Sequence, residues 1–188
     1  MKIKYNLKNH ISNTFIYYLL AVILVPLLCS YLIFIKNKPK ATERFSFFSE
    51  VTYVDEGEFK QSLFNILPED LQIDLYDMDK DDNLFRTYFS SYGLNSDVCL
   101  LSKTTLDKFQ TIDFVNLTST KWDKEDNYHF EDYSIGVHIV NMEYFNVSDT
   151  DETYYLLALK KSVHLNGIVE NSKTDQVDRV LEYLVNNG

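Results

Sequence analysis

The stretch FSFFSEVTYV, residues Phe45 to Val54, is crowded with aromatic and β-branched residues and predicts the first strand of a folded domain. A helix is expected next, over residues 56–67. Asp55 is a suitable N-cap for it, Glu58 favours its first turn, and Pro68 ends it. Strand and helix signals therefore begin to alternate at the start of this domain.

The alternation continues through two more strands. LQIDLY, residues 71–76, alternates as a half-buried strand, and an acidic segment then opens a helix that reaches about Tyr92, with Gly93 as its expected C-terminal cap. DVCLL, residues 97–101, is a short strand expected to be buried on both faces, and Ser102 caps the helix after it. This order, βαβαβα, implies parallel strands joined by right-handed crossovers.

The pattern weakens over residues 110–131, which predicts an irregular segment. YSIGVHIV, residues 133–140, and TYYLLALKK, residues 153–161, are strand-like and predict an antiparallel hairpin. A final amphipathic helix is expected, with Ser172 as its N-cap, Asp175 in its first turn, and a core face of Val177, Val180, Leu181 and Leu184. The predicted fold class is α/β: one mainly parallel, three-layer domain over residues 45–188, with an antiparallel hairpin near the C-terminus.

An apolar run, FIYYLLAVILVPLLCSYLIFI, precedes this domain, and no charged residue lies between Ile11 and Ile35. About 20 apolar residues in a helix span a bilayer, so we expect residues 14–35 to form a transmembrane helix after a short basic tail, residues 1–13. Two alternatives are weaker. A cleaved secretory signal would end in small residues rather than in KNKPK, and a lipoprotein signal would place small residues before Cys29.

Charge is distributed unevenly along the chain. Residues 36–44 form a basic linker, whereas residues 45–188 contain 11 Lys and Arg against 27 Asp and Glu, a net charge of −16. Anionic lipid headgroups and nucleic-acid phosphates would both repel such a domain. We therefore expect a single-pass protein of the cell membrane with an extracytoplasmic C-terminal domain and no nucleic-acid partner. The opposite topology stays open, because lysines flank the apolar run on both sides.

Two segments carry a resemblance to a known class of proteins. SDVCLLSKTTLDKF, Ser96 to Phe109, is similar to a strand and helix of extracellular solute-binding proteins. Tyr154 to Val185 resembles the C-terminal part of small, anchored, solute-binding-like proteins of Gram-positive bacteria. The resemblance implies one lobe of a type II periplasmic-binding-protein fold. It further implies a non-catalytic role, in which the domain binds a small solute, such as a sugar or peptide, or an adjacent membrane protein. The chain departs from the class in being too short for a full second lobe.

Ligands of open α/β sheets bind outside the carboxyl ends of the strands, near a topological switch point. That rule selects the residues that follow the first three predicted strands. The candidate ligand-binding positions are Tyr53, Asp55, Glu56, Ser102 and Lys103, with Asp77 and Asp79 after the second strand. Asp55 and Ser102 also fit the structural role of helix caps, and Tyr53 fits a core position.

Other chemistry finds little support in the sequence. The string Asp77-x-Asp79-x-Asp81 lacks the glycine and the glutamate that a calcium loop needs at its sixth and twelfth positions. The histidines show no metal-ligand spacing, Ser162 and His164 lack the setting of a serine nucleophile, and five glycines supply no phosphate-binding loop. We expect no catalytic residue, metal or cofactor. An interaction module without a small ligand, and a cytoplasm-facing accessory domain, are the alternative hypotheses.

Overall fold

Two units make up the chain, Met1–Pro39 and Lys40–Gly188, and each is described by itself. The computed structural model describes residues 2–36, 39–78, 82–108, 113–147, 151–169, 172 and 174–186. The first unit is one helix. The second unit contains a sheet with helices on both faces.

The helix of the first unit, α1 (Lys2–Lys36), extends further toward the N-terminus than the predicted segment of residues 14–35. Pro26 lies inside α1 without ending it, and the described large apolar side chains between Phe15 and Ile35 are exposed. Within the described residues, no helix combines the length and the apolar character needed to cross a membrane. The structure confirms a helix over residues 14–35, and its membrane-spanning role stays a prediction.

The sheet of the second unit has six strands in the order β2-β1-β3-β6-β5-β4. Its strands are β1 (Arg44–Ser49), β2 (Gln72–Asp77), β3 (Val98–Ser102), β4 (Tyr128–Phe130), β5 (Tyr133–Ile139) and β6 (Tyr154–Ala158). Strand β1 pairs in parallel with β2 and β3, whereas the other neighbours are antiparallel. The sheet is therefore mixed. The prediction of a mainly parallel sheet is right for its first three strands only, and the β5–β6 hairpin is confirmed.

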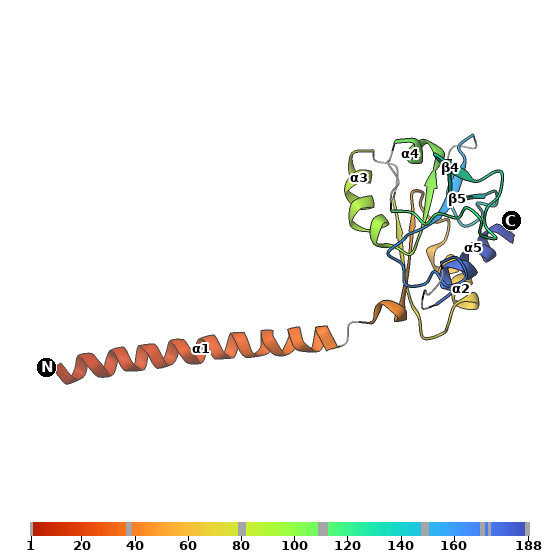
Figure 1. Cartoon of the computed structure of the whole chain (residues 1–188). Helices are drawn as coiled ribbons and strands as arrows, with labels where there is room; N and C mark the ends of the chain where they lie inside the picture. The colour runs from red at the N-terminus through yellow and green to blue at the C-terminus, as the bar shows by residue number, and fades with distance from the viewer. Residues whose placement is uncertain are drawn as a thin grey trace. The chain divides into compact units, whose positions relative to one another are not determined.

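Helices cover both faces of the sheet, which confirms the three-layer prediction. They are α2 (Glu56–Ile66), α3 (Asp82–Ser91), α4 (Lys103–Lys108) and α5 (Gln176–Asn186), with short 3-10 turns η1 (Ala41–Glu43) and η2 (Gly93–Asn95). The side chains of α2 and α5 pack with Phe45 and Phe47 of β1, and those of α3 and α4 pack with Phe48 on the opposite face. Figure 1 shows the two helix pairs on opposite sides of the sheet.

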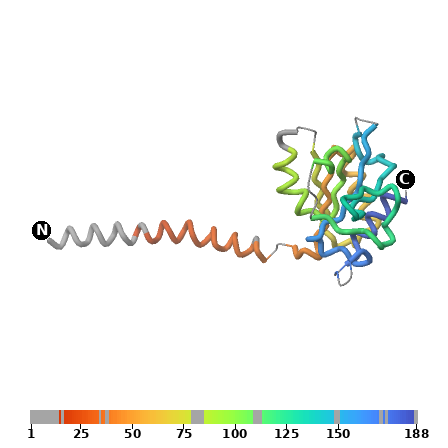
Figure 2. The backbone as a smooth tube through the Cα atoms, turned by 45° about the horizontal axis from the view of Figure 1, so that its top comes forward, coloured from red at the N-terminus to blue at the C-terminus, as the bar shows by residue number. Residues whose placement is uncertain are grey.

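Strand β1 lies inside the sheet and is buried on both faces, because its side chains alternate between the two apolar layers. The three phenylalanines of RFSFFS fit this burial, and its two buried serines form hydrogen bonds, because a strand inside the sheet leaves few solvent-facing positions. Strand β3 is buried in the same way. In the tube of Figure 2 the orange of β1 and the green of β3 run side by side, although about 50 residues separate them in the sequence.

The structure differs from three details of the sequence prediction. Strand β1 ends at Ser49 rather than Val54, because the Ser49 hydroxyl bonds Val51 and bends the chain. Strand β4 lies within the segment predicted to be irregular, residues 110–131. Helix α5 begins at Gln176, and the Ser172 hydroxyl donates to the Val163 carbonyl instead of capping that helix.

Gly93 has a different role from the predicted C-terminal cap of α3. It is buried and begins η2, and a Cβ atom added there would lie 2.2 Å from Cδ2 of Phe89. The backbone at Gly93 is outside the left-handed region that favours glycine. Close packing against Phe89, rather than a left-handed cap, therefore requires glycine at this position.

We predict that Gly93→Ala lowers the free energy of unfolding by about 1–3 kcal/mol, because the new methyl group overpacks the Phe89 layer. The matched control is Gly57→Ala at an exposed position of α2, where the added Cβ would meet Asp55 Oδ1 at 3.2 Å. That control should change the free energy of unfolding by less than about 1 kcal/mol, because the gain in helix propensity and the close contact with the Asp55 side chain oppose each other. Urea unfolding of the detergent-solubilised chain, followed by fluorescence of Trp122, the only tryptophan, measures both changes. A Gly93 variant as stable as wild type would contradict the packing argument.

Candidate functional site

The topological switch point of the sheet lies between β1 and β3. The chain leaves β1 through α2 to reach β2 on one side, and then passes through α3 to β3 on the other side of β1. Adjacent strands whose connections diverge in this way leave a crevice at their carboxyl ends, where α/β proteins bind ligands. Glu50 follows β1 at this edge, and Ser102 is the last residue of β3.

The Glu50 carboxylate fills this crevice. It accepts hydrogen bonds from the Ser102 backbone N–H at 2.7 Å, the Ser102 hydroxyl at 2.9 Å and the Thr105 hydroxyl at 2.6 Å. Only 5% of Glu50 is exposed. Sequence reasoning missed this residue because it was assigned to the interior of a strand. The one signal was an acidic residue in an otherwise apolar run.

The backbone N–H groups in the first turn of α4, beside Glu50, also donate to acceptors within the chain. Lys103 N–H donates to the Thr153 carbonyl at 2.8 Å, Thr104 N–H to Glu152 Oε1 at 3.1 Å, and Thr105 N–H to Ser102 Oγ at 3.2 Å. The last of these bonds confirms Ser102 as the predicted cap. An external anion would have to displace these groups, so this edge is stabilised from within.

Tyr53 packs at the edge of the core. Its ring lies 5.2 Å from that of Phe59, its hydroxyl donates to the Tyr76 carbonyl at 3.3 Å, and its N–H donates to Asp77 Oδ2 at 3.1 Å. Burial, reinforced by the nearby charges of Asp77 and Glu56, raises the pKa of the Tyr53 phenol well above its ordinary value. A neutral, packed phenol of this kind stabilises the fold.

The remaining predicted positions have local roles or are exposed. Asp55 caps α2 by accepting from Glu58 N–H at 3.0 Å, as predicted, while the exposed Glu56 lies in the first turn of that helix. Lys103 is exposed, and Asp79 lies outside the described residues. The structure thus brings Tyr53 to Asp77, and Ser102 to Glu50.

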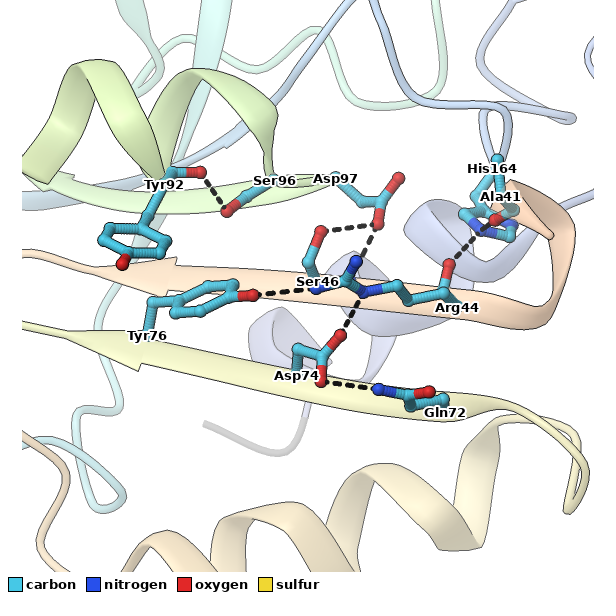
Figure 3. Close-up of polar contacts among 10 residues, drawn as sticks. All are labelled: Ala41, Arg44, Ser46, Gln72, Asp74, Tyr76, Tyr92, Ser96, Asp97 and His164. Atoms are coloured by element: carbon cyan, nitrogen blue, oxygen red, sulfur yellow. Dashed lines mark hydrogen bonds and ion pairs between the residues drawn. The ribbon is translucent and has the colours of Figure 1, made fainter. Parts of the chain in front are cut away.

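A second polar network lies at the amino ends of β1 and β3 (Figure 3). Asp97 Oδ2 accepts from the Ser46 backbone N–H at 2.7 Å and from the Ser46 hydroxyl at 3.0 Å, and Asp97 Oδ1 accepts from Ser162 Oγ at 2.6 Å. Next to it the fully buried His164 places Nε2 2.8 Å from the Arg44 carbonyl and 3.1 Å from the Ala41 carbonyl. His164 therefore holds the start of β1 against the loop that precedes α5.

Asp97, Ser162 and His164 include the residue types of a hydrolytic triad but lack its geometry. The Ser162 hydroxyl donates to Asp97 and accepts from the backbone N–H of His164 at 3.1 Å. Nε2 of the imidazole faces main-chain carbonyls, and Nδ1 faces the side chains of Thr174 and Gln176. A serine nucleophile needs a ring nitrogen as the acceptor of its proton. This cluster consequently connects loops. In addition, among the described residues no group of three or more His, Cys, Asp or Glu side chains could hold a metal ion.

Polar and aromatic side chains also gather on the outward-facing part of β2, which we call the β2 face: Arg44, Gln72, Asp74, Tyr76, Tyr88 and Tyr92. The Arg44 guanidinium bonds Asp74 and donates to the Tyr76 hydroxyl at 2.9 Å, and Gln72 Nε2 donates to Asp74 Oδ1 at 3.0 Å (Figure 3). The bond to Asp74 raises the pKa of Arg44. Its side chain is 40% exposed, so the ion pair with Asp74 lies at the surface of the domain.

Tyrosine rings extend the β2 face toward α3. Tyr92 stacks on Tyr76 with ring centroids 4.8 Å apart, and Tyr88 lies 5.7 Å from Tyr92. The alternation of LQIDLY was the available sequence signal, since Gln72, Asp74 and Tyr76 share one face of the strand. That alternation predicted the strand, and no binding surface was predicted there.

Comparison of the chain with protein families, curated proteins and solved structures gave no match. The resemblance to solute-binding proteins therefore stays a prediction. The arguments about function come from the residues and their geometry.

We predict that Glu50→Ala lowers the free energy of unfolding by roughly 3 kcal/mol, since it leaves the buried donors of Ser102 and Thr105 without an acceptor. Glu50→Gln, which keeps one carbonyl oxygen, should lose less. The exposed Glu56→Ala is the matched control and should change stability by no more than about 0.5 kcal/mol. Equal losses in the Glu50→Ala and Glu56→Ala variants, measured by urea unfolding, would show that Glu50 does not stabilise the β1–β3 edge.

Proposed function

We propose that this chain is a non-catalytic, membrane-attached domain that binds a neighbouring membrane protein on the outside of a bacterial cell. It would use a lobe resembling those of solute-binding proteins. The observation that carries the proposal is the Glu50 carboxylate, which occupies the switch-point crevice and satisfies the donors there.

Small-molecule sites are concave and keep a few polar groups free to orient the ligand. At the carboxyl ends of β1 and β3 those groups are bound to Glu50, Glu152 and Thr153. Displacing the Glu50 carboxylate would break the hydrogen bonds that it accepts, and a solute would have to satisfy the same buried donors. These contacts favour a partner that binds the outer surface over a solute that enters the sheet edge.

Membrane attachment is supported by the N-terminal sequence and by the exposure of α1. No charged residue occurs between Ile11 and Ile35, and the large apolar side chains that the structure describes in this part of α1 are exposed. A helix that is apolar on every side is stable where lipid or protein covers it. The linker of residues 36–44 reaches at most about 30 Å when fully extended, which would restrict partners to the vicinity of the membrane.

The charge of the folded unit supports an external location. Residues 45–188 carry a net charge of −16, and anionic lipids of the cytoplasmic leaflet would repel them. The same charge disfavours nucleic acid as a partner. Two predictions separate this proposal from its alternatives.

The first prediction concerns attachment and topology. The full chain, expressed in a Gram-positive bacterium, should stay with the membranes after an alkaline wash, whereas a chain that begins at Lys40 should not. Protease added to cells with a permeabilised wall should degrade residues 45–188 of the full chain. A protected C-terminal domain would contradict the topology, and full release by the alkaline wash would contradict the attachment.

The second prediction concerns solutes. Sugars and free amino acids at millimolar concentration should leave the thermal midpoint of the detergent-solubilised chain unchanged, because a ligand raises the midpoint only when it binds the folded state. A saturable rise with one of them, reduced in Ser102→Ala but not in the surface variant Ser91→Ala, would restore the solute-binding hypothesis and overturn the protein-partner proposal.

A further inference from the structure

We infer that the outer edge of β2 is the docking strand for an extended segment of the partner protein rich in Lys or Arg, which would add to the sheet beside β2. The inference rests on the proposed function and specifies its surface and the chemistry of its partner. It combines an open strand edge, a row of exposed tyrosines and a set of exposed acids.

The sheet has two edge strands, and they differ in what they offer. Strand β4 has three residues, too few for extensive pairing, whereas β2 has six and pairs with β1 alone among the described residues. An edge strand directs alternate N–H and C=O groups away from its sheet, and a partner strand can bind them. The edge of β2 is therefore the longer template for an added strand.

Exposed apolar side chains gather beside this edge. The described part of residues 40–188 has six large, exposed apolar side chains, and Val54, Tyr88 and Tyr92 are three of them, at 65%, 43% and 42% exposure. Tyr92 stacks on Tyr76 of β2, and Val54 follows Tyr53, whose N–H binds Asp77 at the end of β2. Tyrosine rings at a rim can cover the side chains of an added strand at little entropic cost.

The charged residues around β2 indicate which kind of strand could bind at its edge. Glu69 and Asp70 before β2, and Asp77 at its end, are exposed, while Arg44 compensates only Asp74. Two copies pairing through this edge would place acids opposite acids, which destabilises a strand pair. A segment with Lys or Arg at alternate positions would instead form opposite-charge pairs across the new strand boundary, so the partner contributes a basic, extended segment.

The probe is a fluorescent peptide of about eight residues that alternates lysine and valine, titrated into the full chain in detergent micelles and followed by anisotropy. Binding should be lost when alternate peptide nitrogens are methylated, since methylation blocks the new ladder, and when glutamate replaces lysine. Tyr92→Ala and Tyr88→Ala should each weaken binding about fivefold or more. Tyr133→Ala, which removes a 50% exposed tyrosine from β5, is the matched control and should bind as wild type does.

A second matched pair tests the charge. Glu69→Gln should weaken binding about twofold at low salt. Glu125→Gln should not, because Glu125 precedes β4, which is at the other end of the sheet order from β2. No anisotropy change at millimolar peptide would overturn the inference. So would equal binding of the methylated peptide, or equal losses in the Tyr92 and Tyr133 variants. Any of these three results, with the chain still found in the membrane fraction and not binding the solutes tested, would refute the docking edge and leave the proposed function intact.

Discussion

Two buried carboxylates hold β1 against β3, and the rest of the second unit depends on that junction. At the amino ends Asp97 of the β3 side accepts from Ser46 of β1, and at the carboxyl ends Glu50 of the β1 side accepts from Ser102 of β3. Only three residue pairs lie between them in the ladder. A slip of one residue would turn both acids away from their donors and exchange the two apolar faces of β1, so the register is strongly specified.

This junction also determines where the molecule can bind anything. In an α/β sheet the switch point is the natural ligand crevice, but here the groups that fix the register occupy it. The same donors cannot hold the sheet together and remain free for a solute. Polar groups that still face solvent are found at β2, where Gln72, Asp74 and Tyr76 lie on the face opposite the buried Ile73. The polar groups at the centre of the sheet thus stabilise the fold, and we expect binding at the edge of the sheet instead.

Sequence patterns predicted the elements whose burial is regular. The period-two and period-3.6 patterns gave β1 to β3, α2, the β5–β6 hairpin and the core face of α5, because apolar burial alone defines those segments. They did not predict β4 or the burial of Trp122, whose indole N–H donates to Asp178 at 2.8 Å. Both depend on contacts between distant segments that carry no local periodicity. Ser102 was found as a cap, but its bond to Glu50 connects residues 52 apart and has no local signature. The antiparallel hairpin was predicted, but its pairing with β3 in the same sheet was not, since strand order is decided by long-range packing.

The way the acids are used explains how a domain with such excess negative charge folds. Glu50, Asp55 and Asp97 accept hydrogen bonds from backbone N–H and hydroxyl groups rather than from cations. Bonds of this kind do not consume positive side chains, and salt screens them less than exposed ion pairs because two of the three acids are buried. The fold therefore needs few compensating cations, and the domain keeps a strong net negative charge. That field acts at long range, repelling copies of the domain from one another and raising the encounter rate with basic partners, and its strength decreases as ionic strength rises.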